Sequence, residues 1–160
     1  MKTLFLVRHA HSGWHNSHEG DFERPLSERG RMEAKEMALR MRRKGVVPEL
    51  MVSSPALRAI STADIFADLL GYSPEKIVQK IEIYQGGPGE LASIIQAIPE
   101  QCGTVLLFGH NPVITMLSSW LSGKSMASME TCGIIMIDLG NRNWSDVKEG
   151  CGIAVCYEHP

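Results

Sequence analysis

Four side chains that can carry protons or hold anions follow the first apolar run of the sequence. Residues 6–16 read LVRHAHSGWHN and contain Arg8, His9, His11 and His15. An imidazole can act as a nucleophile, a base or a metal ligand, whereas an arginine favours an anion. Three interpretations therefore follow: a metal cluster, a histidine that does covalent chemistry, or a polar loop without a chemical role.

Three further residues of this kind occur far along the chain, each close to the end of an apolar run. Arg58 lies in the first turn of a predicted helix behind VSSP, Glu82 follows a weak apolar stretch, and His110 follows TVLLFG. Cations are disfavoured in the first turn of a helix because of the helix dipole. The position of Arg58 therefore indicates an anion nearby.

Strand-like and helix-like patterns alternate along the sequence. Apolar runs predict strands over residues 2–7, 49–54, 76–83, 104–109, 133–139 and 152–158. Four amphipathic segments between them predict helices. The first has Ser27 as its N-cap and ends at Gly45, the second begins at Pro55 and ends at Gly71, and the third contains Leu91–Ile98 and stops at Pro99. The fourth has Asn111 as its N-cap and ends at Gly123.

This order predicts an α/β fold: a three-layer α/β/α sandwich around a mostly parallel sheet with an antiparallel edge strand. In such sheets ligands bind at the carboxyl ends of the strands, where the helices begin. Arg8, His9, Arg58, Glu82 and His110 all lie at such positions. We therefore expect the arginines and His9 and His110 to share one pocket.

A pocket of two arginines and two imidazoles suits a phosphoryl group, because guanidinium forks match its oxygens and helix N-termini add free N–H groups. A neutral His9 could attack phosphorus in line, and water would then release the phosphoryl group from the ring. Arg8, Arg58 and a protonated His110 would neutralise the phosphoryl oxygens. This chemistry needs no metal, and the arginines would repel a cation.

Four segments resemble the signatures of the histidine phosphatase superfamily, also called the phosphoglycerate mutase-like family. LVRHAHSGW resembles LVRHGES-x-W, and RPLSERG resembles the helix start PLT-x-x-G. VSSPALRAISTA resembles SSP-x-x-R-A-x-x-TA, and GHNP resembles the segment of the second histidine. The matches follow the family's order and extend over nearly the whole chain. The short chain, RPLS and ETCGIIMIDL look most similar to the SixA branch, whose members dephosphorylate phosphohistidine on proteins.

The resemblance implies a phosphoglycerate mutase-like fold and a role for each matched residue. His9 would be the phosphorylated nucleophile, and Arg8, Arg58 and His110 would complete the phosphate pocket. Glu82, in IEIYQG, stands where larger members carry an acidic proton donor.

The sequence also departs from the family pattern near the nucleophile. Ala10 replaces the usual glycine, and His11 stands at the position of the first-loop acid. The methyl group of Ala10 is tolerable if its φ is negative. We add His11, Ser12 and Asp21 to the candidate substrate-binding residues.

The loop ahead of RPLS offers alternatives for two roles. Asp21 and Glu19 are alternatives to Glu82 as the proton donor. His11, His15 and His18 could in principle hold a metal, but the other strand ends offer few further ligands. We therefore expect a polar loop at the pocket rim.

Composition limits the function classes. The chain has 160 residues, a net charge of −2 and no apolar stretch of the ~20 residues that a membrane span needs. We expect one domain over residues 1–160, located in the cytoplasm, that binds neither nucleic acid nor membrane and uses no cofactor. The four cysteines form no C-x-x-C pair, which favours free thiols.

Together these observations predict a metal-independent phosphatase that forms a covalent intermediate on His9. The predicted substrate is phosphohistidine on a protein, because little chain is left to form a lid over a small metabolite. A small phosphomonoester is the second candidate. A non-catalytic module that binds phosphate or a phosphoprotein is the third, although binding alone needs no nucleophile.

Overall fold

The computed structural model describes residues 1–13 and 20–160. Its elements, in chain order, are β1 (Lys2–Arg8), α1 (Glu28–Arg43), β2 (Leu50–Ser53), α2 (Leu57–Leu70), η1 (Pro74–Lys76), β3 (Val78–Gln79), α3 (Glu82–Gln85), α4 (Pro88–Gln96), β4 (Thr104–Gly109), α5 (Val113–Ser122), β5 (Ile134–Gly140), η2 (Trp144–Asp146) and β6 (Ile153–Glu158). None of the helices in these two ranges is long and apolar enough to span a membrane.

The strands form one six-stranded sheet in the order β3-β2-β4-β1-β5-β6. The pairs β1–β4, β2–β4 and β2–β3 are parallel, whereas β5 runs antiparallel to both β1 and β6. The predicted α/β/α fold is therefore confirmed, and the β5–β6 hairpin provides its antiparallel edge. The carboxyl ends of β1, β2 and β4 meet at one side of the sheet.

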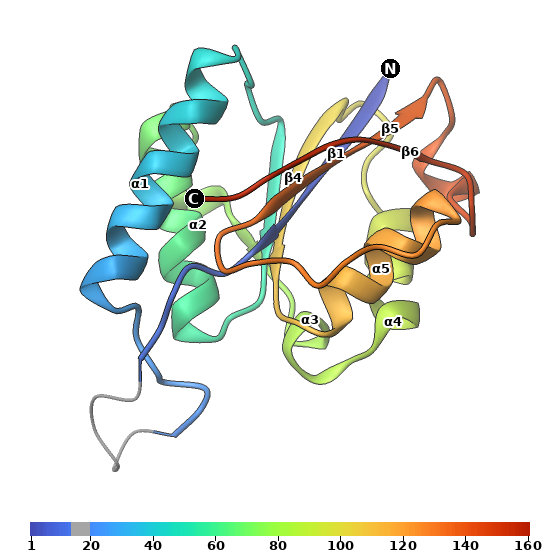
Figure 1. Cartoon of the computed structure of the whole chain (residues 1–160). Coiled ribbons are helices and arrows are strands. Elements are labelled where there is room, and N and C mark those ends of the chain that lie inside the picture. The colour runs from blue at the N-terminus through green and yellow to red at the C-terminus, as the bar shows by residue number, and fades with distance from the viewer. Residues whose placement is uncertain (14–19) are drawn as a thin grey trace.

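Helices cover both faces of this sheet, as Figure 1 shows: α1 and α2 lie on one face, and α3, α4 and α5 lie on the other. Side chains alternate between two cores along the central strands. In β1, Leu4 and Leu6 enter the core on the α4–α5 side, whereas Phe5 and Val7 enter the core on the α1–α2 side. Burial on both faces explains why these strands are continuous apolar runs in the sequence.

The helix boundaries follow the predicted capping residues closely. The side chain of Ser27 caps α1 by accepting a hydrogen bond from Gly30 N, and Gly71 and Gly123 end α2 and α5 in the left-handed conformation. The N-cap of α5 is Pro112, not Asn111 as predicted. The Asn111 side chain instead donates to Met129 O and accepts from Thr115 Oγ1.

The third predicted strand is the element that differs most from its prediction. Only Val78–Gln79 of the predicted 76–83 pairs in the sheet, at the edge beside β2. The chain then turns, and Glu82 begins the short helix α3. A strand at the edge of a sheet forms hydrogen bonds with a neighbouring strand on one side only. Shortening β3 therefore loses few hydrogen bonds between strands.

Candidate active site

The site forms where β1 and β4 end side by side. These parallel strands pair Arg8 with Gly109, so the next residues, His9 and His110, emerge together. The His9 N–H donates to Gly109 O (3.0 Å), and the two imidazole rings lie 5.3 Å apart between centroids. Strand register therefore brings together His9 and His110, which are 101 positions apart in the sequence.

Arg58 reaches the same place from α2. Its side chain is buried, with 6% of the residue exposed. One turn later, Thr62 is fully buried; its hydroxyl donates to Arg58 O (2.7 Å) and accepts from Ala10 N (3.0 Å). Thr62 thus ties the helix turn that carries Arg58 to the loop behind His9. Ala10 does not have a positive φ, which explains why the chain accepts alanine there.

A hydrogen bond determines which nitrogen of His9 can react. His9 Nδ1 lies 2.7 Å from Ala10 O. Because a carbonyl oxygen can only accept, Nδ1 carries the proton in this contact and Nε2 keeps its lone pair. His9 is 7% exposed. The site therefore holds a neutral imidazole with Nε2 as the available nucleophilic nitrogen.

Three buried nitrogen atoms around His9 lack a hydrogen-bond partner among the residues that the structure describes. They are Arg8 Nε, Arg58 Nε and His110 Nδ1. A buried polar atom without a partner costs free energy comparable to a lost hydrogen bond. These three atoms lie on residues of one small site, which we call the anion cradle because an oxyanion could accept hydrogen bonds from all three.

Burial and positive neighbours keep both imidazoles uncharged. Burial is the main cause that lowers the pKa of His9 to about 3; the Ala10 carbonyl opposes this shift, and His110, Arg58 and Arg8 add to it. Burial, with Arg58 as the next cause, lowers the pKa of His110 to about 4. His110 is therefore neutral near pH 7, which differs from the predicted protonated form. The positive charge at the site comes from arginines: Arg8, Arg58 and the neighbouring Arg24, which also lowers the pKa of His110.

Asp21 interacts directly with Arg58. The guanidinium donates through Nη1 to Asp21 O (2.6 Å) and through Nη2 to Asp21 Oδ2 (3.0 Å). The Tyr84 hydroxyl donates to the same oxygen (2.8 Å), and this bond, with Arg58, lowers the pKa of Asp21. An ionised Asp21 is a poor proton donor. Asp21 instead accepts hydrogen bonds from Nη1 and Nη2 of Arg58, on the side of the guanidinium opposite the unpartnered Nε.

His11 and Ser12, the two candidates in the loop after β1, form hydrogen bonds with segments nearby in the fold. His11 Nδ1 lies 2.6 Å from Ser27 Oγ, and His11 N donates to the buried Glu33 carboxylate (2.9 Å). Arg24 donates to both Ser12 O and Ser12 Oγ. These contacts connect both residues to the start of α1 and the segment before it. They do not join the two residues to the four that form the cradle.

Gly30 explains the glycine of the RPLSERG segment. A Cβ at this position would lie 1.9 Å from His11 O, because the first turn of α1 packs directly on the loop behind His9. Only glycine permits this approach.

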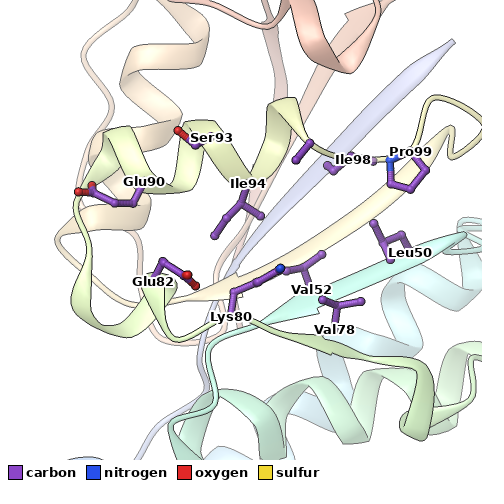
Figure 2. A pocket seen from close by; sticks show the side chains of 11 residues that line it. Leu50, Val52, Val78, Lys80, Glu82, Glu90, Ser93, Ile94, Ile98 and Pro99 are labelled. Carbon is purple, nitrogen blue, oxygen red and sulfur yellow. The ribbon is translucent and has the colours of Figure 1, made fainter.

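The structure does not bring Glu82 to the other predicted residues. Glu82 is exposed at the start of α3, and its side chain lines a groove of about 450 Å³ with Lys80, Val78 and Ile94 (Figure 2). The groove lies between α4 and the β2–β3 edge, and none of Arg8, His9, Arg58 or His110 lines it. His15, His18 and Glu19 lie outside the described residues.

Sequence reasoning missed Tyr84 and Ser54. Tyr84 stands two positions after Glu82, and its ring packs edge-on at 5.6 Å from the His110 ring. Ser54 Oγ lies 2.8 Å from His110 Nε2. The signal for Ser54 was its place at the end of a strand beside Pro55, whereas no sequence pattern distinguished Tyr84 from Glu82.

No three His, Cys, Asp or Glu side chains within residues 1–13 and 20–160 are grouped so that they could hold a metal ion. The groups that converge on the site are guanidinium and imidazole nitrogens, which together favour an anion over a cation. The described residues thus fit a phosphoryl group better than a metal.

Comparison with known proteins agrees with this geometry. The family model of the histidine phosphatase superfamily (branch 1) matches residues 4–87. An uncharacterised chloroplastic protein of Arabidopsis thaliana is 28% identical over 91% of this chain and 70% of its own length. A phosphoglycerate mutase of Bifidobacterium longum, dependent on 2,3-bisphosphoglycerate, is 37% identical over 41% of this chain and 27% of its own length.

Solved structures with the same fold include SixA proteins. The protein histidine phosphatase SixA in complex with tungstate has a TM-score of 0.84 and 25% identity, over 98% of this chain and 96% of that one. A protein from Agrobacterium tumefaciens described as a candidate SixA phosphohistidine phosphatase has a TM-score of 0.81 and 25% identity, over 99% and 98% of the two chains.

Proposed function

This chain belongs to the histidine phosphatase superfamily, and we propose that it hydrolyses phosphohistidine on a protein through a phosphoryl intermediate on His9, without a metal. Family and fold support phosphatase activity on a phosphorylated substrate. The observation that carries the mechanism is the set of unpartnered nitrogens on Arg8, Arg58 and His110 beside a free His9 Nε2.

The proposed reaction has two displacements at phosphorus. In the first, the lone pair of His9 Nε2 attacks, a new N–P bond forms, and the P–N bond of the substrate breaks. The substrate imidazole leaves with the bond electrons and takes a proton from water. In the second, water attacks the phosphoryl group, the His9 Nε2–P bond breaks with its electron pair returning to Nε2, and inorganic phosphate leaves; the proton that the attacking water gives up neutralises the hydroxide left by the first step. Arg8, Arg58 and the His110 N–H hold the phosphoryl oxygens in both steps.

The choice of phosphohistidine rests on two arguments. An imidazole leaving group needs less protonation than an alkoxide, and Asp21, the acid that contacts Arg58 among the described residues, is ionised. The likeness to SixA, over nearly the full length of both chains, supports the same substrate class. A small phosphomonoester remains the second candidate.

Turnover of two substrates tests the proposal. A protein carrying phosphohistidine should be hydrolysed faster than p-nitrophenyl phosphate, and His9→Ala should lower both rates at least about 10³-fold, as loss of a nucleophile does. His159→Ala is the matched control, because His159 is exposed near the chain end. Preference for the aryl phosphate would favour the second candidate, and hydrolysis that survives His9→Ala would contradict the mechanism.

Metal independence is tested in the same assay. Chelation with EDTA should leave both rates unchanged, because the proposed mechanism places arginine and imidazole nitrogens around the phosphoryl oxygens. Loss of activity that added Zn²⁺ restores would contradict this part of the proposal.

A further inference from the structure

Ser54 is a fully buried serine whose hydroxyl lies between a backbone donor and an imidazole. It follows the last residue of β2, and its own N–H donates to Phe108 O on β4 (3.1 Å). Its Oγ accepts from Ala56 N (3.1 Å) and lies 2.8 Å from His110 Nε2. Backbone bonds on both sides therefore fix the position of this hydroxyl against His110.

The position of each proton follows from these contacts. Ala56 N is a donor, so the Ser54 hydroxyl hydrogen cannot go there. His110 Nε2 is the acceptor within reach among the described contacts of this hydroxyl. A buried hydroxyl hydrogen without an acceptor is costly. The favourable arrangement has Ser54 Oγ–H donating to the lone pair of His110 Nε2.

A neutral imidazole that accepts at Nε2 carries its proton at Nδ1. His110 Nδ1 is one of the three buried site nitrogens without a partner among the described residues. The opposite tautomer would leave the Ser54 hydrogen unpaired and turn a lone pair toward the phosphoryl oxygens. The doubly protonated ring would also leave the Ser54 hydrogen unpaired. The low pKa of His110 agrees with a neutral ring.

We propose that Ser54 is a positioning residue that holds His110 as the neutral Nδ1–H tautomer, so that His110 serves the reaction as a hydrogen-bond donor to a phosphoryl oxygen rather than as a positive charge. The catalytic benefit rests on the proposed function, whereas the tautomer itself is a property of the resting protein. The arginines then supply the whole positive charge of the cradle.

The tautomer can be measured directly in the wild-type protein. Long-range ¹H–¹⁵N spectra at pH 7 distinguish a protonated from a bare nitrogen at each ring position. We expect His110 to show a protonated Nδ1 and a bare Nε2. A protonated Nε2, in either the other neutral tautomer or the imidazolium, would overturn the proposal, whatever substrate the protein hydrolyses.

Ser54→Ala tests whether the serine is the cause. In this variant His110 should no longer be protonated at Nδ1 alone. We expect kcat to fall roughly tenfold, the effect of one misdirected hydrogen bond in a transition state. Ser118→Ala is the matched control: Ser118 is also fully buried, but its hydroxyl donates to Thr115 O (2.7 Å) within α5. An unchanged Nδ1–H signature in Ser54→Ala would refute the role of Ser54. If that variant does not fold, the wild-type spectrum alone decides the tautomer.

Discussion

In the folded protein His9 is buried and His110 is half-buried, and both rings are neutral at pH values at which they would carry a proton in the unfolded chain. In the folded protein the pKa of His9 is about 3 and that of His110 about 4, mainly because of burial. An unperturbed histidine titrates near pH 6.5. Between pH 6.5 and about 4 the unfolded chain therefore binds protons on these rings and the folded chain does not. Lowering the pH over this interval must favour unfolding.

This predicts a histidine-specific part of the pH dependence of stability. Each ring should contribute up to about 1.4 kcal/mol per pH unit to the fall in unfolding free energy below pH 6.5. His9→Asn should remove the contribution of His9 to the change of unfolding free energy with pH, measured by urea unfolding at pH 4.5, 5.5 and 6.5. His159→Asn, at an exposed position, should keep the wild-type slope. Equal slopes for wild type and His9→Asn would show that His9 is not held neutral by burial.

Asp21 offers a second prediction, because its carboxylate contacts Arg58. Asp21→Asn keeps a polar acceptor but removes a negative charge beside the anion cradle. Inhibition by inorganic phosphate should therefore become stronger, by roughly threefold to tenfold, measured as Ki. Weaker phosphate binding would mean that Asp21 mainly holds Arg58 in place.

Glu82→Gln gives the comparison for that experiment. Glu82 is exposed in the groove beside α4, so we expect its Ki for phosphate and its kcat to stay within about twofold of wild type. A selective loss of phosphomonoester hydrolysis in Glu82→Gln would restore the role that the sequence suggested for this residue.

At the level of elements, α1 packs closely on the loop behind His9 and so positions His9, the proposed nucleophile. Ser27 caps α1 and bonds to His11, Glu33 accepts from His11 N, and Gly30 leaves room for the His11 carbonyl. The start of α1 thus supports residues 9–13, which lie in neither a helix nor a strand. Precise support of this kind is what in-line attack requires.

Gly30→Ala should disrupt this support. A Cβ 1.9 Å from His11 O forces backbone to move, so we expect a loss of roughly 1–3 kcal/mol of unfolding free energy together with reduced kcat. Gly89→Ala in α4 is the matched control, since a Cβ there meets nothing within 4 Å. That substitution should be neutral or stabilising by up to about 1 kcal/mol. Equal effects of the two substitutions would mean that α1 does not pack as described.

The elements also show what the sequence could and could not predict. Apolar runs and strong caps correctly placed β1, β4 and α1, and parallel pairing then made it possible to predict that His9 and His110 meet. The direction of a single side chain depends on a turn of few residues, which periodicity does not resolve. For this reason Glu82 was expected in the site, whereas the short helix α3 brings Tyr84 there.

At the scale of the whole molecule, the sheet brings residues that are far apart in the sequence together in one site. Arg8, His9, Arg58 and His110 come from three segments, and the order β2-β4-β1 puts the ends of those segments side by side. The two cores on either side of the sheet keep these strand ends fixed. A rigid sheet can therefore hold buried charges and unpartnered donors that an irregular loop could not.

The most direct test of the central claim is to trap the phosphoryl group on the protein. Wild-type protein is mixed with a phosphohistidine-bearing protein, quenched with alkali within milliseconds to seconds, and digested for mass spectrometry. We expect one acid-labile phosphoryl group on His9 that forms and decays with turnover and is absent in His9→Ala. Phosphate release without any label on His9, or a label on another residue, would contradict the account.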